Sequence, residues 1–174
     1  MKNPQKLYHS RIRLALVIML LWNCFLSSAQ TKEGNIWYFG NKAGLDFNSG
    51  SPVALINSVM LASEGCSSIA DTAGNLLFYT EGMTIYNKNH QPMANGTGLM
   101  AGWSSSQAAM IVKKPCSDNI YYVFTTPHQG SAADGLRYSV VDMALQGGLG
   151  QVIQKNVFVF QPVLEKVIAV RHQN

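Results

Sequence analysis

The chain has 174 residues, 47% of them hydrophobic, which is the ordinary range for a globular protein. Its formal net charge of +4 comes from residues 1–29, which hold four of the 13 basic residues and none of the nine acidic ones. Nine residues of each sign remain after Ala29, without a basic cluster. The composition therefore argues against a nucleic-acid-binding protein.

Residues 1–29 have the layout of a secretory signal peptide. Basic residues come first, the apolar run Leu14–Leu26 follows, and the small residues Ser27 and Ala29 come last. We expect a signal helix at 1–29, cleaved before Gln30, and an exported domain at 30–174 with no stable membrane span after cleavage. An uncleaved N-terminal anchor is the alternative. The basic residues of this segment are Lys2, Lys6, Arg11 and Arg13.

Three similar runs recur in the exported part, each opened by asparagine. They read "NIWYFG" from Asn35, "NLLFYT" from Asn75 and "NIYYVF" from Asn119. A strand covered on one face alternates apolar and polar residues, whereas these runs are apolar or aromatic at nearly every position. The pattern predicts strands buried on both faces. The intervals between them are rich in Gly, Asn, Ser and Pro, which indicates turns rather than helices.

The spacing of the runs, 40 and 44 residues, fits the blades of a β-propeller. We therefore predict an all-β fold, a partial β-propeller of about three blades of short antiparallel strands. A closed ring needs about four blades or more, so we expect this chain to be the N-terminal piece of a longer protein or a truncated reading frame. A β-sandwich is the alternative fold.

The strands of two units can be located individually. In the first unit, a strand in "SSIAD" leads through a tight turn at Asp71–Asn75 into "NLLFYT" and "MTIYNK". The second unit holds "QAAMIVKK", "NIYYVF", "GLRYSVVDM" and "QVIQKNVFVF". The segments 41–52 and 87–98 are expected to be turns. The run "LEKVIAVRH" at 164–172 is expected to be a strand without a partner.

Acidic residues are the first candidates for chemistry, because propeller hydrolases use pairs of carboxylates. Glu64 and Glu81 are the best placed for the mouth of a ring, but capping of turns is the favoured role for all acids near predicted strand ends. These acids are Glu64, Asp71, Glu81, Asp134 and Asp142.

The remaining candidates are weaker. Cys66 is predicted to be small, buried and unpaired, although it and Cys116 could form one disulfide. The histidines after the signal lack a metal-ligand spacing, and Asn95–Thr97 has the N-glycosylation pattern. Trp37, Trp103 and the tyrosines could form a sugar platform, but a place in the core is favoured. We therefore assign no catalytic, cofactor-binding or metal-binding residue. The histidines are His90, His128 and His172.

Most of the exported part resembles the N-terminal propeller-like region of large exported proteins from gliding bacteria. The matching stretches are 35–55, 64–82 ("EGCSSIADTAGNLLFYTEG"), 85–99, 105–115, 119–125, 135–143 and the "GGLG" at 147–150. Proteins of this kind often carry PKD-type modules and a gliding-motility-associated, type IX secretion sorting domain. This sequence holds neither.

The resemblance implies an exported protein at the cell surface or outside the cell, with a binding or adhesion role. We expect a surface ligand, glycan or protein, and no enzymatic activity. The alternatives are a fragment of a secreted propeller enzyme acting on carbohydrate and a non-functional truncated gene product. The absence of a sorting domain makes a periplasmic location the alternative for this chain.

Overall fold

The computed structural model describes residues 31–170, and the predicted signal peptide lies outside the described residues. The described part contains β-strands and two short 3-10 helices, η1 (Gln129–Asp134) and η2 (Gln146–Gly148). The all-β prediction is confirmed. Within residues 31–170, no helix is long and apolar enough to cross a membrane.

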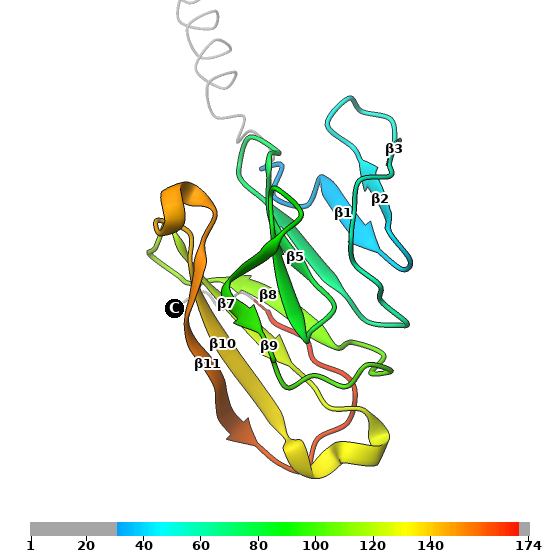
Figure 1. Ribbon diagram of the computed structural model, residues 1–174, viewed down its shortest axis with the longest axis vertical. Helices are drawn as coiled ribbons and strands as arrows, with labels where there is room; N and C mark the ends of the chain where they lie inside the picture. Colours follow the sequence, from blue (N-terminus) through cyan, green and yellow to red (C-terminus); the bar gives the residue numbers. More distant parts are fainter. Residues whose placement is uncertain (1–30, 171–174) are drawn as a thin grey trace, which may run out of the picture. The chain divides into compact units, whose positions relative to one another are not determined.

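The strands form three successive antiparallel groups, which we call the first, middle and third sheets (Figure 1). The first sheet comprises β1 (Ile36–Phe39), β2 (Ala43–Asp46) and β3 (Val53–Leu55). The middle sheet comprises β4 (Ser67–Ala70), β5 (Leu76–Thr80), β6 (Thr84–Asn87) and β7 (Pro92–Thr97). The third sheet comprises β8 (Ala109–Lys113), β9 (Ile120–Thr125), β10 (Leu136–Asp142) and β11 (Gln151–Phe160).

The middle and third sheets are each an antiparallel meander in which consecutive strands pair. A parallel pair between Ala94 of β7 and Gln151 of β11 joins them into one eight-stranded sheet. The two end strands of that sheet, β4 and β8, contact each other, so the sheet nearly closes on itself. This closure does not by itself identify a propeller.

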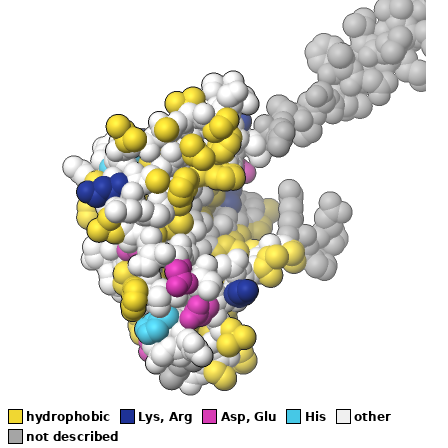
Figure 2. Space-filling model, turned by 90° about the vertical axis from the view of Figure 1, so that its right-hand side faces the viewer, with side chains coloured by type: hydrophobic (Ala, Val, Ile, Leu, Met, Phe, Trp, Pro, Cys, Tyr) yellow, Lys and Arg dark blue, Asp and Glu magenta, His cyan; other side chains and the backbone are white. Residues whose placement is uncertain are grey.

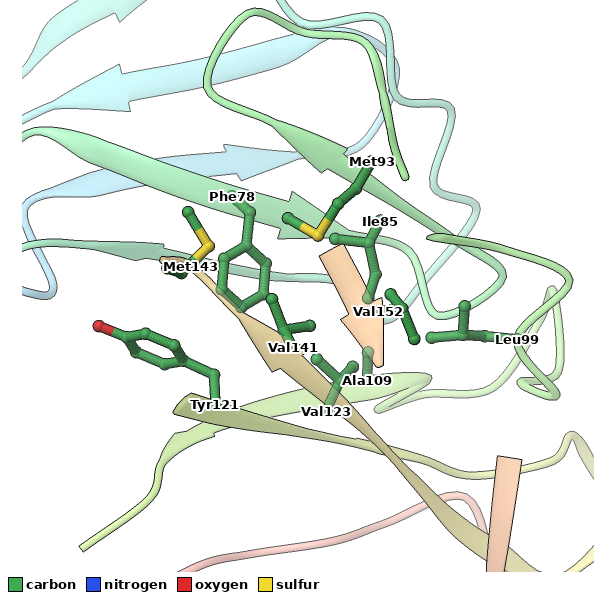
Figure 3. Packing of buried hydrophobic residues seen from close by; sticks show 10 residues of the cluster. All are labelled: Phe78, Ile85, Met93, Leu99, Ala109, Tyr121, Val123, Val141, Met143 and Val152. Carbon is green, nitrogen blue, oxygen red and sulfur yellow. The ribbon is translucent and has the colours of Figure 1, made fainter. Parts of the chain in front are cut away.

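Two hydrophobic cores separate the three sheets. The core between the middle and third sheets contains Phe78 and Ile85 from one side and Val123 and Val141 from the other (Figure 3). The core between the first and middle sheets contains Ile36, Tyr38 and Tyr79. The middle sheet is therefore covered on both faces.

Burial on both faces, predicted for all three asparagine-opened runs, holds only for β5. There, Phe78 and Tyr79 are both 0% exposed. In β1, Tyr38 is buried, but Trp37 is 51% exposed and Phe39 is 38% exposed. The prediction is wrong for β1 because the described residues place no sheet against its outer face.

Eight predicted strands are confirmed as β1, β4, β5, β6, β8, β9, β10 and β11. Of the three further strands, β2 and β7 lie in segments expected to be turns, and β3 directly follows the first of those segments. Gly44 of β2 shows why such residues mislead, because a Cβ there would come within 2.8 Å of the Tyr38 ring and the Trp37 carbonyl oxygen. This glycine permits close packing inside a strand and does not mark a turn.

The free edge of β1 is capped by a side chain of the middle sheet. Ser68 Oγ accepts a hydrogen bond from the Tyr38 N–H at 3.2 Å and donates one to the Ile36 carbonyl at 2.8 Å. The backbone groups at this edge are thereby satisfied without a further strand. The first and middle sheets are tied together at the same place.

The predicted strand at 164–172 is not formed in its described part. Residues 161–170 run without regular secondary structure, and the Glu165 carbonyl accepts a hydrogen bond from the Gln107 N–H at 3.0 Å. The apolar side chains of this segment are largely exposed, Ile168 at 85%. The segment is held by a few polar contacts near the start of β8.

Candidate functional site

A cleft of about 320 Å³ lies where the chain enters β4 and β8. Ser67 at the start of β4 pairs with Thr80 at the end of β5, and Ala109 at the start of β8 pairs with Thr125 at the end of β9. The approaching segments 64–66 and 106–107 lie together in the wall of the cleft. The cleft is lined by Glu64, Gly65, Cys66, Ser106, Gln107, Ala109, Met110 and Val167.

Hydrogen bonds fix the two approaching segments against each other. The Gly65 N–H donates to the Ser105 carbonyl at 3.0 Å. Thr126 Oγ1 donates to the Gln107 carbonyl at 2.9 Å and lies 2.8 Å from Ser105 Oγ, which therefore donates to it. Ser105 is 0% exposed and Thr126 is 1% exposed. This buried network gives the cleft a fixed polar wall.

Glu165 binds a set of donors at the rim of the cleft. One carboxylate oxygen, Oε2, accepts from the N–H and the hydroxyl of Ser106, both at 3.1 Å. The other, Oε1, accepts from the Gln129 N–H at 2.7 Å. The backbone hydrogen bond from Ser106 is the main cause that lowers the pKa of Glu165, and the nearby His128 adds to it. The carboxylate is thus held in its charged form.

An exposed aromatic ring stands beside these donors. Trp103 is 62% exposed, and its ring centroid lies 6.5 Å from that of His128. Ser131 Oγ lies 3.0 Å from His128 Nδ1 and fixes that ring. We call Trp103, Ser106, His128, Gln129 and Glu165 the rim. Figure 2 shows a face where acidic side chains and a histidine gather beside hydrophobic ones.

Glu64 and Glu81, the two acids that the sequence places best for the mouth of a ring, do not form a catalytic pair in the structure. Glu64 lines the cleft, whereas Glu81 is 7% exposed and its Oε1 accepts the Thr84 N–H at 2.8 Å. Burial raises the pKa of Glu81, and the hydrogen bonds of its own turn oppose that effect only in part. Its second oxygen, Oε2, is buried without a partner in the described part of the chain. Glu81 therefore braces the turn between β5 and β6.

Two other acids cap turns, the role that the sequence favoured. Asp71 Oδ1 accepts from the Ala73 N–H and the Asn75 N–H, both at 2.9 Å. Asp142 Oδ1 accepts from the Ala144 N–H at 2.9 Å. Asp134 contributes its backbone carbonyl to Arg137 Nε at 2.9 Å.

Both cysteines of the described residues are free, as predicted for Cys66. Cys66 is half-buried rather than buried, and its thiol lies 3.5 Å from the Tyr38 carbonyl. Burial raises the pKa of the thiol, which keeps it protonated and weakly nucleophilic. Its place in the cleft wall is therefore a packing role. Cys116 is exposed in the turn before β9.

The other sequence candidates are placed as follows. Trp37 and Trp103 are both exposed, so the favoured place in the core is wrong for them. Asn95 Nδ2 donates to the Val152 carbonyl at 2.9 Å, so the side chain of the glycosylation pattern joins β7 to β11. Within residues 31–170, no three His, Cys, Asp or Glu side chains cluster as metal ligands would. His172 lies outside the described residues.

Sequence patterns alone do not single out Glu165, Ser106 or Gln107. The sequence gives one weak indication of a special role for Glu165. It is the single acidic residue within the apolar run 163–170, and a buried strand would not tolerate an unpaired carboxylate there. The rim depends on three segments that are 22 or more residues apart in the chain, and their meeting follows from the fold.

No family model, curated protein or solved structure matches this chain.

Proposed function

We propose that the chain is an exported binding module, built from propeller-like β-units, whose rim binds carbohydrate at the cell surface or outside the cell. The observation that carries the proposal is Trp103, exposed on a fixed loop beside an ionised carboxylate and hydrogen-bonding side chains. A flat exposed ring stacks on the apolar face of a sugar, and carboxylates and amides bind its hydroxyls.

The propeller-like arrangement is supported by the directions in which equivalent residues face. We call the side of a sheet toward the next sheet in the chain forward, and the opposite side backward. The third residue after each opening asparagine faces forward, toward the next core in the first two cases. These residues are Tyr38, Phe78 and Tyr122.

The fourth residue after each asparagine faces backward. Tyr79 packs in the core shared with the first sheet, and Val123 packs in the core shared with the middle sheet. Phe39 is the equivalent residue in β1 and is partly exposed. The three runs thus have the same orientation in three successive sheets, which is the repetition that blades around an axis require.

A backbone hydrogen bond repeats in the same way. Gly65, two residues before β4, donates its N–H to Ser105 on the approach to β8. Gln107, two residues before β8, donates its N–H to Glu165. β4 and β8 are therefore each preceded by a residue that bonds a later segment of the chain in the same way, as in a stack of related units.

Export is supported by the signal-like order of residues 1–29 and by the resemblance to surface proteins of gliding bacteria. Binding is favoured over hydrolysis because only Glu64 of the candidate pair lines the cleft. Glu81 is engaged with its own turn.

A glycan array probed with the purified exported protein tests this proposal. We expect binding to a subset of glycans and a change in tryptophan fluorescence on titration with the best of them. Trp103→Ala should weaken that binding by about tenfold or more, because an aromatic contact is lost. Trp37→Ala is the matched control, since Trp37 is similarly exposed but belongs to the first sheet.

A wild-type protein that binds no glycan on the array would contradict the carbohydrate proposal. Equal binding by wild type and Trp103→Ala would show that the rim is not the site. Binding to peptides alone would identify a protein-binding module instead.

A further inference from the structure

Two aromatic sheet faces lie at the two ends of the series of sheets. The backward face of the first sheet carries Trp37 and Phe39, which are 51% and 38% exposed. The forward face of the third sheet carries Tyr122, Phe124 and Tyr138, all half-buried. Their ring centroids lie 5.7–6.3 Å apart, so they form one aromatic surface.

The two internal junctions show how such faces dock. At the first junction, the forward ring of Tyr38 lies 4.6 Å from the backward ring of Tyr79. At the second, the forward ring of Phe78 lies 5.6 Å from the backward ring of Tyr121. At each junction, the ring at the third position after the asparagine therefore meets a backward ring of the following sheet.

We propose that a second copy of this chain docks head to tail, with the forward face of one third sheet against the backward face of the other copy's first sheet. Tyr122 is the forward ring at the third position, and Trp37 and Phe39 are the backward rings available to it. The outer faces thus repeat the residue positions of both internal junctions. Because the contact joins two different faces, copies either close into a ring or extend into a chain.

Docking by faces fits the edge of β1 better than strand addition does. Ser68 already bonds the Tyr38 N–H and the Ile36 carbonyl, so a strand from another copy would have to displace it. The inference rests on the repeat arrangement within the proposed function and does not depend on the carbohydrate ligand.

The test is the molar mass of the exported protein, measured by analytical ultracentrifugation over a range of concentrations. We expect the wild-type protein to self-associate in a concentration-dependent way. Trp37→Asp and Tyr122→Asp should each weaken association by more than about tenfold, because each places a charge in one of the two faces. Trp103→Asp, at an exposed tryptophan of the rim, should associate as wild type does.

Mixing the two single variants tests the head-to-tail geometry. Trp37→Asp keeps an intact forward face and Tyr122→Asp keeps an intact backward face, so an equimolar mixture should form a one-to-one complex. Circular dichroism melting of each variant alone identifies any that has not folded. In that case, Trp37→Ser and Tyr122→Ser replace the pair.

A wild-type protein that stays monomeric at all concentrations would overturn the inference, as would a mixture that does not associate. Equal disruption by Trp103→Asp would also overturn it. The ligand test is independent, because Trp37→Asp should keep glycan binding and Trp103→Asp should lose it. Failure of one proposal is therefore distinguishable from failure of the other.

Discussion

The middle sheet and the first sheet each contain a similar apolar, aromatic-rich strand in different surroundings. Phe78 and Tyr79 of β5 are both 0% exposed, whereas the equivalent pair in β1, Tyr38 and Phe39, has one buried and one partly exposed ring. Both strands therefore carry two apolar faces. The comparison teaches that the sequence specifies the faces that can pack, and the neighbouring sheets determine which of them do.

The largest expected effect comes from truncating the equivalent rings of the two sheets. Phe78→Ala removes a fully buried ring from the core between the middle and third sheets and should destabilise the fold by about 3–5 kcal/mol. Phe39→Ala removes a partly exposed ring and should cost about 1 kcal/mol or less. Denaturant unfolding monitored by fluorescence gives both values.

Equal losses of stability for Phe78→Ala and Phe39→Ala would contradict the difference in burial between β5 and β1, because they would mean that the backward face of β1 is covered in solution. A typical domain is stable by about 5–15 kcal/mol, so Phe78→Ala is expected to leave a marginal fold. Unfolding should be measured below the concentration at which copies associate.

The second largest loss of stability is expected at the contact between the first and middle sheets. Ser68→Ala leaves the Tyr38 N–H and the Ile36 carbonyl without their partner at the edge of β1. We expect a loss of about 1–3 kcal/mol in the free energy of unfolding. Ser67→Ala is the control, because the Ser67 side chain makes no hydrogen bond within the described part of the chain. A loss no greater than that of the control would show that water caps the edge equally well.

The burial difference between β1 and β5 explains how far the sequence could predict the fold. The runs at 35–40, 75–80 and 119–124 are all strands, because aromatic and branched residues on both faces favour the extended backbone. Which faces are covered depends on sheets distant in the chain. The same limit applies to β7, where Asn95 and Gly96 indicate a turn but the strand is held by the Asn95 bond to Val152.

The site could be predicted even less well. Glu64 lines the cleft because it lies on the segment that leads into β4, whereas turn capping is the role that the sequence favours for it. The rim needs Trp103, Gln129 and Glu165 to meet from three loops, and single-sequence patterns carry no signal for such contacts. Local turn chemistry, in contrast, is readable, as the capping by Asp71 shows.

A smaller change in stability is expected when the acidic side chain of Glu81 or Asp46 is replaced by its amide, and the two changes should differ in sign. Burial raises the pKa of Glu81 above that of the unfolded chain, so its contribution to stability is present at low pH and is lost as the pH rises through the raised pKa. Glu81→Gln should therefore stabilise the fold by about 1 kcal/mol near neutral pH and not in acid. Asp46→Asn should instead cause a small loss, because the carboxylate of Asp46 accepts the Asn48 N–H at 2.7 Å.

Thermal melting at two pH values measures this effect. Destabilisation by Glu81→Gln at neutral pH would mean that the buried carboxylate has a partner that offsets its desolvation. The turn between β5 and β6 would then resemble the turn after β2, and the contrast between the two sheets would fail at this position.

The smallest effect concerns the polar joint between the first and middle sheets. His90 Nε2 lies 2.8 Å from Asn57 Nδ2, and its Nδ1 lies 3.1 Å from the Tyr79 hydroxyl. Tyr38 completes this hydrogen-bond network, because its hydroxyl donates to Asn57 Oδ1 at 2.9 Å. An imidazole nitrogen that accepts from an amide must be unprotonated, so this network requires neutral His90.

Burial lowers the pKa of His90 below its ordinary value. A lowered pKa in the folded state stabilises the fold above the unfolded pKa, and this contribution is lost as the pH falls through the lowered value. We therefore expect the free energy of unfolding to fall between about pH 8 and about pH 5, and to fall less in His90→Asn. Asparagine suits the left-handed backbone of this position, where φ is 59°, and does not titrate. If the two proteins lose stability equally over this range, the joint between the sheets does not depend on the protonation of His90.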